Sequence, residues 1–303
     1  MTRFNSDATI QDVLNDKELK EYSEFFYYKF PLDINNKRID DTSWYAREAI
    51  NWFYEKKVEK KTSIIRFNKH NKDVNLIQIS HKKAAKFAFI VSGGGFVCID
   101  TAHEGIPIAK ELYEKGYDIF LLTYRLNENA KLNKTTIDIN DAISYIVKNK
   151  TKLNVDVKDF LLVGGSAGAY IASSYCSNNR GYIKRYNPKP KCLCLLYPIV
   201  DFHMPESNIK EIVIGPNPSK YLISKYSVVN HASTFPPTLI VHSKDDDCVP
   251  VSQSEALCKS LNKNNIRNQL LLYETGKHGW GIGKKLEPES WLELFYKFIL
   301  DIE

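Results

Sequence analysis

The chain has 303 residues, of which 43% are hydrophobic and 26% charged, and its formal net charge is +6. A chain of this length and apolar content can bury a sizeable core as one large domain. Its lysines are spread along the sequence instead of forming a basic block interleaved with aromatic residues, which excludes an obvious nucleic-acid partner. No signal-peptide pattern and no apolar run of roughly 18 residues is present, so we expect a soluble, cytoplasmic protein without a membrane partner.

The first 60 residues form an aromatic-rich extension. The segments YSEFFYYKF and WYAREAINWFYEKK have helical spacing, but they have no place in the sheet expected further along the chain. We expect residues 1–60 to form a lid or flanking helices and residues 61–303 to form the main domain. The aromatic side chains either bury the extension against that domain or contribute to a substrate pocket.

Strand-like and helix-like segments alternate after residue 62, which predicts an α/β fold with a mostly parallel sheet and helices on both faces. Apolar runs predict eight strands, at residues 63–67, 75–79, 86–92, 118–124, 159–165, 192–198, 238–243 and 268–274. The first two are expected to pair as a hairpin. Helices are expected at residues 104–115, 137–148, after 166, from 252 and at 290–300, with an irregular stretch over 201–235.

The six cysteines lack the paired spacings of a zinc site and the density of a disulfide scaffold. Cys192 and Cys194 form a C-x-C pair, which can bind a metal, but they alternate along an expected strand and therefore point to one face. We expect most of the cysteines to be reduced core residues, with neither a metal nor a cofactor.

The run LLVGGSAGA is an apolar strand that ends in G-x-S-x-G, with Ser166 at its centre. This pattern is typical of the nucleophile elbow of α/β-hydrolases, in which a serine lies on a strained turn between a strand and a helix. Gly164 and Gly168 leave room for the close approach of backbone segments at such a turn. Ser166 is therefore the candidate nucleophile.

A serine hydroxyl needs an imidazole to accept its proton and a carboxylate to orient that imidazole. The acidic sequence KDDDCVP follows the expected strand TLIVHS, and His278 follows the next strand, so both groups come at the carboxyl edge of the sheet. The order Ser, Asp, His is that of α/β-hydrolases. Spacing alone leaves three choices for the acid, namely Asp245, Asp246 and Asp247.

Acyl transfer also needs hydrogen-bond donors for the oxyanion. The expected strand KFAFIVS runs into Gly93, Gly94 and Gly95, where the absence of side chains lets backbone N–H groups face a substrate. We expect Gly93 and Gly94 to donate, together with the N–H of Ala167. A phosphate-binding loop is the competing interpretation, but neither G-x-G-x-x-G nor a G-K-[ST] ending is present.

These strings resemble the acetyl esterase and lipase branch of the α/β-hydrolases, near the bacterial acetylxylan-esterase-like enzymes. The resemblance extends from Lys86 to Phe298 and is carried by SGGGF, HEGIPIAKELYEKGYDIFLLTYRL, LLVGGSAGA, LLYPIVDF, PPTLIVHSKDDDCVPVSQSEAL and GKHGWGIG. In this family the acid stands four residues after a histidine, which maps from His242 onto Asp246. The family's H-G-[FW]-G maps its histidine onto His278.

The resemblance implies a serine esterase that hydrolyses short-chain, acetyl-type carboxylic esters of small molecules without a cofactor. Tyr170 and Trp280, close in sequence to the serine and the histidine, are expected to line a small acyl pocket or else to pack in the core. A serine peptidase or amidase of the same fold is an alternative function. A ligand-binding homologue without turnover, or an interaction protein built on the aromatic extension, is another. The oligomeric state is not predicted.

Overall fold

The structure is a computed structural model that describes residues 2–30, 36–39, 46–131, 133–204, 209–283 and 290–302. The helices are α1 (Ile10–Asn15), α2 (Lys20–Phe26), α3 (Ala46–Val58), α4 (Thr101–Glu104), α5 (Ile106–Glu114), α6 (Asn133–Lys148), α7 (Lys150–Leu153), α8 (Ser166–Cys176), α9 (Tyr182–Arg185), α10 (Ile209–Ile214), α11 (Lys220–Tyr226), α12 (Ser252–Lys263) and α13 (Trp291–Leu300). The strands are β1 (Tyr27–Tyr28), β2 (Thr62–Ile65), β3 (Asn75–Ile79), β4 (Ala85–Val91), β5 (Ile99–Asp100), β6 (Asp118–Thr123), β7 (Val155–Gly165), β8 (Cys192–Leu196), β9 (Thr238–Ser243) and β10 (Asn268–Tyr273).

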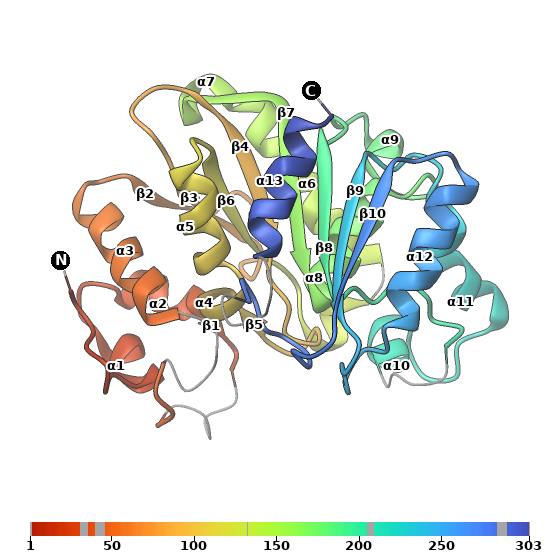
Figure 1. The fold of residues 1–303 in the computed structure, drawn as a ribbon. Coiled ribbons are helices and arrows are strands. Elements are labelled where there is room, and N and C mark those ends of the chain that lie inside the picture. Colours follow the sequence, from red (N-terminus) through yellow and green to blue (C-terminus); the bar gives the residue numbers. More distant parts are fainter. Residues whose placement is uncertain are drawn as a thin grey trace.

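An eight-stranded sheet forms the centre of the molecule, in the order β10-β9-β8-β7-β4-β6-β3-β2 (Figure 1). The six strands from β10 to β6 are parallel, whereas β3 pairs antiparallel with β6 and β2 pairs antiparallel with β3. The sequence-based prediction of eight strands, including the initial hairpin, is therefore confirmed.

Two hydrophobic clusters cover the two faces of the sheet, because successive side chains of each strand point to opposite sides. On β4, for example, Ile90 belongs to the cluster with α5, α13 and the N-terminal helices, whereas Phe89 belongs to the cluster with α6, α8 and α12. Cys192 and Cys194 both lie in the first cluster and are fully buried, so their prediction as core residues is confirmed.

Residues of the N-terminal extension pack against the main domain beside α4 and α5 (Figure 1). Phe26 on α2 meets Phe53 on α3 in an edge-to-face contact with 4.9 Å between ring centroids, and both rings are fully buried. Strand β1 then pairs with β5, in a small two-stranded sheet outside the central one. Part of the extension, residues 31–35 and 40–45, lies outside the described residues.

Three segments differ from the predicted elements. The helix expected at 104–115 begins at Thr101, where the Asp100 side chain caps α4, and is interrupted at Gly105 before α5. The stretch over 201–235 was expected to be irregular but contains α10 and α11. Strand β7 begins at Val155, earlier than expected, and its pairing with β4 contains a register shift.

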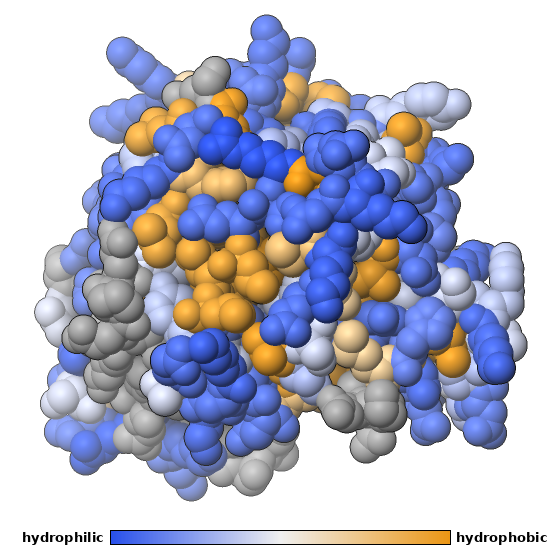
Figure 2. Space-filling view, turned by 45° about the vertical axis from the view of Figure 1, so that its right-hand side comes forward, coloured by the Kyte–Doolittle hydropathy of each residue, from blue (hydrophilic) through white to orange (hydrophobic). Residues whose placement is uncertain are grey.

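Strand β10 forms one edge of the sheet and is only partly covered (Figure 1). Leu272 on this strand is 37% exposed, and Leu300 on α13 is 50% exposed. The face of the molecule in Figure 2 is largely hydrophilic around a hydrophobic patch near its middle. Within the described chain, the edge strand β10 pairs with β9 on one side and with no strand on the other.

Candidate active site

The candidate site lies at the carboxyl ends of neighbouring parallel strands. Val91 of β4 stands opposite Gly164 of β7, so the glycine loop after β4 is adjacent to the turn that carries Ser166. Strand β9 leads to Asp246, and β10, parallel to it, leads to His278. Ligand sites of open α/β sheets are found at this edge, because the loops that follow the strands meet there.

Ser166 occupies the turn between β7 and α8 with a φ of +50°, a left-handed conformation that side-chain-bearing residues rarely adopt. The turn depends on its glycines. A Cβ atom at Gly164 would lie 2.6 Å from the Gly168 carbonyl oxygen, and one at Gly168 would collide with the backbone at Val91. The two glycines of G-x-S-x-G therefore permit the close approach that the sequence pattern predicts.

A continuous chain of hydrogen bonds connects the serine, histidine and acid. His278 Nε2 lies 2.8 Å from Ser166 Oγ, and His278 Nδ1 lies 2.7 Å from Asp246 Oδ2. Because a carboxylate only accepts hydrogen bonds, Nδ1 carries the imidazole proton and Nε2 is left to accept the serine hydroxyl. This arrangement can remove the proton from Ser166 as its oxygen attacks a carbonyl carbon.

The geometry also distinguishes the three adjacent aspartates. Asp245 accepts a hydrogen bond from the Lys277 backbone N–H at 2.8 Å. Asp247 lies 3.8 Å from the Lys277 ammonium group, and both of those side chains are largely exposed. Asp246 alone of the three contacts the His278 imidazole.

Asp246 is held by several donors besides His278. His242 Nε2 lies 3.1 Å from Asp246 Oδ2 and 2.9 Å from the Val249 carbonyl oxygen, so this nitrogen carries a proton and donates. The backbone N–H groups of Cys248 and Val249 donate to Asp246 Oδ1. Burial alone would raise the pKa of Asp246, but its hydrogen bonds and the charge of His278 outweigh burial and hold that pKa well below its ordinary value.

The structure corrects one predicted oxyanion donor. The Gly93 N–H points to the buried Glu104 carboxylate, with 2.6 Å between N and Oε2, so it is not free to face a substrate. The N–H groups of Gly94 and Ala167 have no hydrogen-bond acceptor among the described residues. Ala167 lies in the first turn of α8, where backbone donors and the helix dipole favour negative charge.

Tyr170 and Trp280, the expected pocket-lining residues, are core residues instead. The Tyr170 side chain is fully buried, and its hydroxyl accepts a hydrogen bond from Arg180 and donates one to the Tyr226 carbonyl. Trp280 is 1% exposed and packs edge to face against Tyr197. Tyr170 and Trp280 belong to the hydrophobic clusters on opposite faces of the sheet, and their burial leaves them almost no accessible surface to offer to a substrate.

Three residues of the site were missed as functional candidates, namely His242, Glu104 and Tyr197. His242 lies in the predicted strand TLIVHS, and the H-x-x-x-D spacing that maps the acid onto Asp246 is the signal that places His242 near that acid. Glu104 is buried in the first short helix after the glycine loop, and Tyr197 follows β8. A glutamate inside the apolar sequence AHEGIPIA was the available signal.

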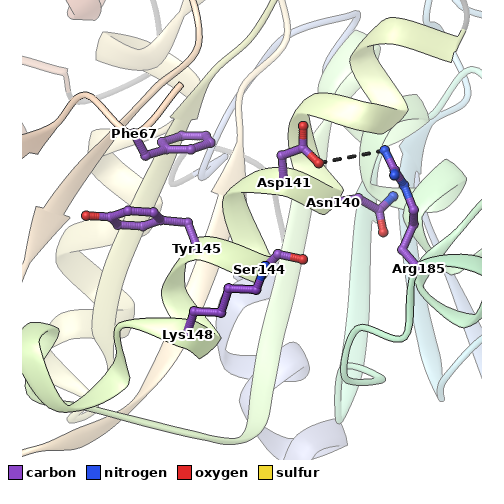
Figure 3. Close-up of a pocket in the computed structure, with 7 residues that line it drawn as sticks. All are labelled: Phe67, Asn140, Asp141, Ser144, Tyr145, Lys148 and Arg185. Carbon is purple, nitrogen blue, oxygen red and sulfur yellow. Dashed lines mark ion pairs between the residues drawn. The ribbon is translucent and has the colours of Figure 1, made fainter. Parts of the chain in front are cut away.

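A separate cavity of about 420 Å³ lies over α6, away from these residues. Its lining residues are Phe67, Asn140, Asp141, Ser144, Tyr145, Lys148 and Arg185 (Figure 3). Several of its polar groups already have partners: Asp141 pairs with Arg185, and Ser144 and Asn140 both bond to the neighbouring Asn187. The Ser144 hydroxyl in this cavity donates to the Asn187 side-chain oxygen at 2.6 Å and not to a histidine or a carboxylate.

Neither a metal centre nor a membrane span is found in the part of the chain that the structure describes. Within those residues no group of three or more His, Cys, Asp or Glu side chains could hold a metal ion. None of their helices combines the length and hydropathy needed to cross a bilayer.

Comparisons with known proteins identify the family. The family model BD-FAE matches residues 73–261, more than half of the chain. Endo-1,4-β-xylanase B from Butyrivibrio fibrisolvens is 26% identical over 285 residues, which cover 90% of this chain and 42% of that protein. Isoprenylcysteine α-carbonyl methylesterase from Arabidopsis thaliana is 21% identical over 263 residues, which cover 77% of this chain and 59% of that protein. The chain spans about half the length of the curated relatives it matches.

Solved structures show the same fold. The acetyl ester-xyloside bifunctional hydrolase from Caldicellulosiruptor lactoaceticus is 25% identical with a TM-score of 0.71, and the match covers 79% of this chain and 96% of that chain. A thermophilic esterase from Thermogutta terrifontis is 20% identical with a TM-score of 0.65, covering 80% of this chain and 94% of that chain. The chain belongs to the BD-FAE family and has the α/β-hydrolase fold.

Proposed function

We propose that this protein is a serine esterase that hydrolyses short-chain, acetyl-type carboxylic esters of small molecules. The observation that carries the proposal is the hydrogen-bonded chain from Ser166 through His278 to Asp246, with distances of 2.8 and 2.7 Å. The position of Ser166 on a strained turn at the carboxyl edge of the sheet supports a nucleophilic role for this serine.

In the proposed reaction, Ser166 Oγ attacks the ester carbonyl carbon while His278 Nε2 takes its proton. Asp246 keeps the imidazole in the required tautomer and stabilises the imidazolium that forms. The N–H groups of Gly94 and Ala167 stabilise the oxyanion. His278 then protonates the departing alcohol, and a water molecule, activated by the same imidazole, releases the acid from the acyl-enzyme.

The acetyl-type substrate is supported by the relatives and by the enclosed nucleophile. The structurally similar hydrolase from Caldicellulosiruptor lactoaceticus is described as acting on an acetyl ester, at 25% identity to this chain. Ser166 itself is only 5% exposed, which favours a small acyl group over a long one. We therefore expect turnover to fall as the acyl chain lengthens.

The test is hydrolysis of p-nitrophenyl acetate, butyrate and octanoate, and of an aminoacyl p-nitroanilide, by the purified protein and its Ser166→Ala variant. We expect Ser166→Ala to lower kcat on the acetate by about 10⁴-fold or more with the fold intact. Ser173→Ala is a matched control, because Ser173 lies on the same helix, is buried and bonds only to the Tyr170 carbonyl in the described structure.

Each outcome of this assay discriminates between functions. Turnover of the acetate that depends on Ser166 and declines toward the octanoate supports the proposal. Preferential cleavage of the anilide would replace it with a peptidase or amidase. Ligand binding without release of p-nitrophenol from any substrate would indicate a homologue that has lost turnover.

A further inference from the structure

A buried carboxylate that the proposed reaction does not use lies against the nucleophile. Glu104 ends α4 and is 6% exposed. Its Oε2 accepts the Gly93 N–H at 2.6 Å, and its Oε1 accepts the Tyr197 hydroxyl at 3.1 Å. Both carboxylate oxygens are therefore engaged by groups from other loops of the site.

The space around this carboxylate is shared with Ser166. A Cβ atom at Gly93 would lie 2.5 Å from Glu104 Oε2 and 2.9 Å from Ser166 Cβ. A Cβ atom at Gly165 would lie 2.8 Å from the same oxygen. The sequence places glycine at both positions, so the carboxylate packs directly against the backbone of the glycine loop and of the residue before Ser166.

Tyr197 connects this carboxylate to the loop that carries His278. Leu196, at the end of β8, stands opposite Gly165, which places Tyr197 next to the serine turn. Its hydroxyl accepts the Gly281 N–H at 3.2 Å, and its ring meets the His278 imidazole edge to face, with 4.7 Å between centroids. The contacts run without a break from the glycine loop through Glu104 and Tyr197 to the histidine loop.

We propose that Glu104, acting with Tyr197, is a positioning residue that fixes the oxyanion loop and the histidine loop relative to Ser166. By accepting the Gly93 N–H, the carboxylate holds that peptide in the orientation that leaves the next N–H, of Gly94, facing the reaction. Through Tyr197 it restrains the Gly281 backbone and the adjacent imidazole. This inference rests on the proposed esterase function and adds a role that the three proposed catalytic residues do not perform.

The surroundings of Glu104 make its positioning of the two loops dependent on pH. Burial, and next the nearby Asp100 carboxylate, raise the pKa of Glu104 to about 7, against the lowering effects of His278, Gly93 and Tyr197. Other titratable groups of this region include His103, paired with Asp100 at 2.8 Å, Tyr27, whose ring meets His103, and Cys98 and Tyr124. The carboxylate is thus charged above pH 7, where it binds the Gly93 N–H most strongly, and is protonated below it.

The test compares kcat and KM of Glu104→Gln and the unmodified protein on p-nitrophenyl acetate between pH 5.5 and 8.5. We expect the variant's kcat to fall about 10-fold or more at pH 8.5, with KM changed less than twofold, because a neutral amide replaces a charge-assisted hydrogen bond. We expect that ratio to shrink as the pH falls below 7, because Glu104 of the unmodified protein then becomes neutral too. Asp118→Asn is the matched control: its carboxylate is buried at the amino end of β6 and contacts His81.

A second pair of variants keeps the test valid if Glu104→Gln fails to fold. Tyr197→Phe removes only the hydroxyl that links the two loops, and we expect it to lower kcat about 10-fold at unchanged KM. Tyr175→Phe is its control, since that buried hydroxyl bonds to the Pro188 carbonyl on another part of the fold.

A Glu104→Gln variant with full kcat, or with the same relative loss at every pH, would overturn the inference while leaving the esterase function standing. Absence of Ser166-dependent turnover in the unmodified protein would instead overturn the proposed function itself.

Discussion

We expect the buried Glu104 carboxylate to lower the free energy of unfolding above pH 7, where its charge strengthens the hydrogen bond from the Gly93 N–H. Its pKa rises from an ordinary value of 4.5 to about 7 in the folded protein, chiefly because of burial. Between these two values the unfolded chain has released the proton that the folded protein still binds. The free energy of unfolding therefore decreases as the pH rises through this window, and the loss is complete above pH 7.

The size of the loss follows from the pKa difference. One pKa unit corresponds to 1.36 kcal/mol, so the shift of Glu104 corresponds to about 3 kcal/mol. The amide side chain of the Glu104→Gln variant does not titrate, so the variant does not lose this unfolding free energy as the pH rises. We expect the unfolding free energy of the variant, relative to the unmodified protein, to increase by about 3 kcal/mol between pH 4.5 and pH 8.

Urea unfolding of both proteins, followed by tryptophan fluorescence at half-unit pH steps, measures this difference. Subtracting the two curves removes the contributions of other titrating groups that the substitution leaves unchanged. A difference that stays flat across the window would refute the reasoning, since Glu104 would then titrate at the same pH in the folded and unfolded states. A difference that declines with pH would mean that its contacts favour the charged form more than burial opposes it.

Other substitutions test the rest of the site and the fold. Asp246→Asn should lower kcat about 10⁴-fold, whereas Asp245→Asn and Asp247→Asn should each change it less than about tenfold. A larger loss in either of the last two variants would mean that the neighbouring aspartate, and not Asp246, orients His278. His242→Leu removes a donor to Asp246, so we expect kcat to fall about 10-fold and the acidic limb of the pH profile to move to higher pH; an unchanged profile would deny it that role. Deleting residues 1–60 should leave an insoluble or unfolded chain by circular dichroism, because it strips the cover from buried apolar surface; a fully active truncated protein would contradict this.

Most strands of the central sheet could be predicted because they are short segments dominated by apolar residues. KFAFIVS and TLIVHS are buried on both faces and bounded by polar or glycine-rich segments, so their length and composition identified them. The pair β1 and β5 could not be found in this way, since two residues are too few to show any period. Helices α10 and α11 are short and lie among Pro and Asn residues, which favoured an irregular interpretation.

Ser166 and His278 could be predicted because the α/β-hydrolase pattern places the nucleophile and the histidine in loops that follow particular strands. The acid needed the resemblance to known hydrolases, and the structure separates Asp246 from its neighbours through the contacts that Lys277 makes with those neighbours. Glu104 could not be assigned to the site from the sequence, because its place inside the apolar sequence AHEGIPIA indicates burial but not which groups it contacts. Its contacts come from the neighbouring glycine loop, at Gly93, and from Tyr197, which lies 93 residues further along the chain.

The place of β10 at the edge of the sheet affects how the protein loses function. The strand that leads to His278 is bonded to β9 and to no other strand of the described chain. An edge strand can fray while the interior strands remain paired, because fewer hydrogen bonds and contacts must break. Such local opening would carry the imidazole away from Ser166 and leave the two-sided core in place. We therefore expect the arrangement of Ser166 and His278 to be less stable than the sheet as a whole. On heating or in mild denaturant, the protein should lose activity before the central sheet unfolds.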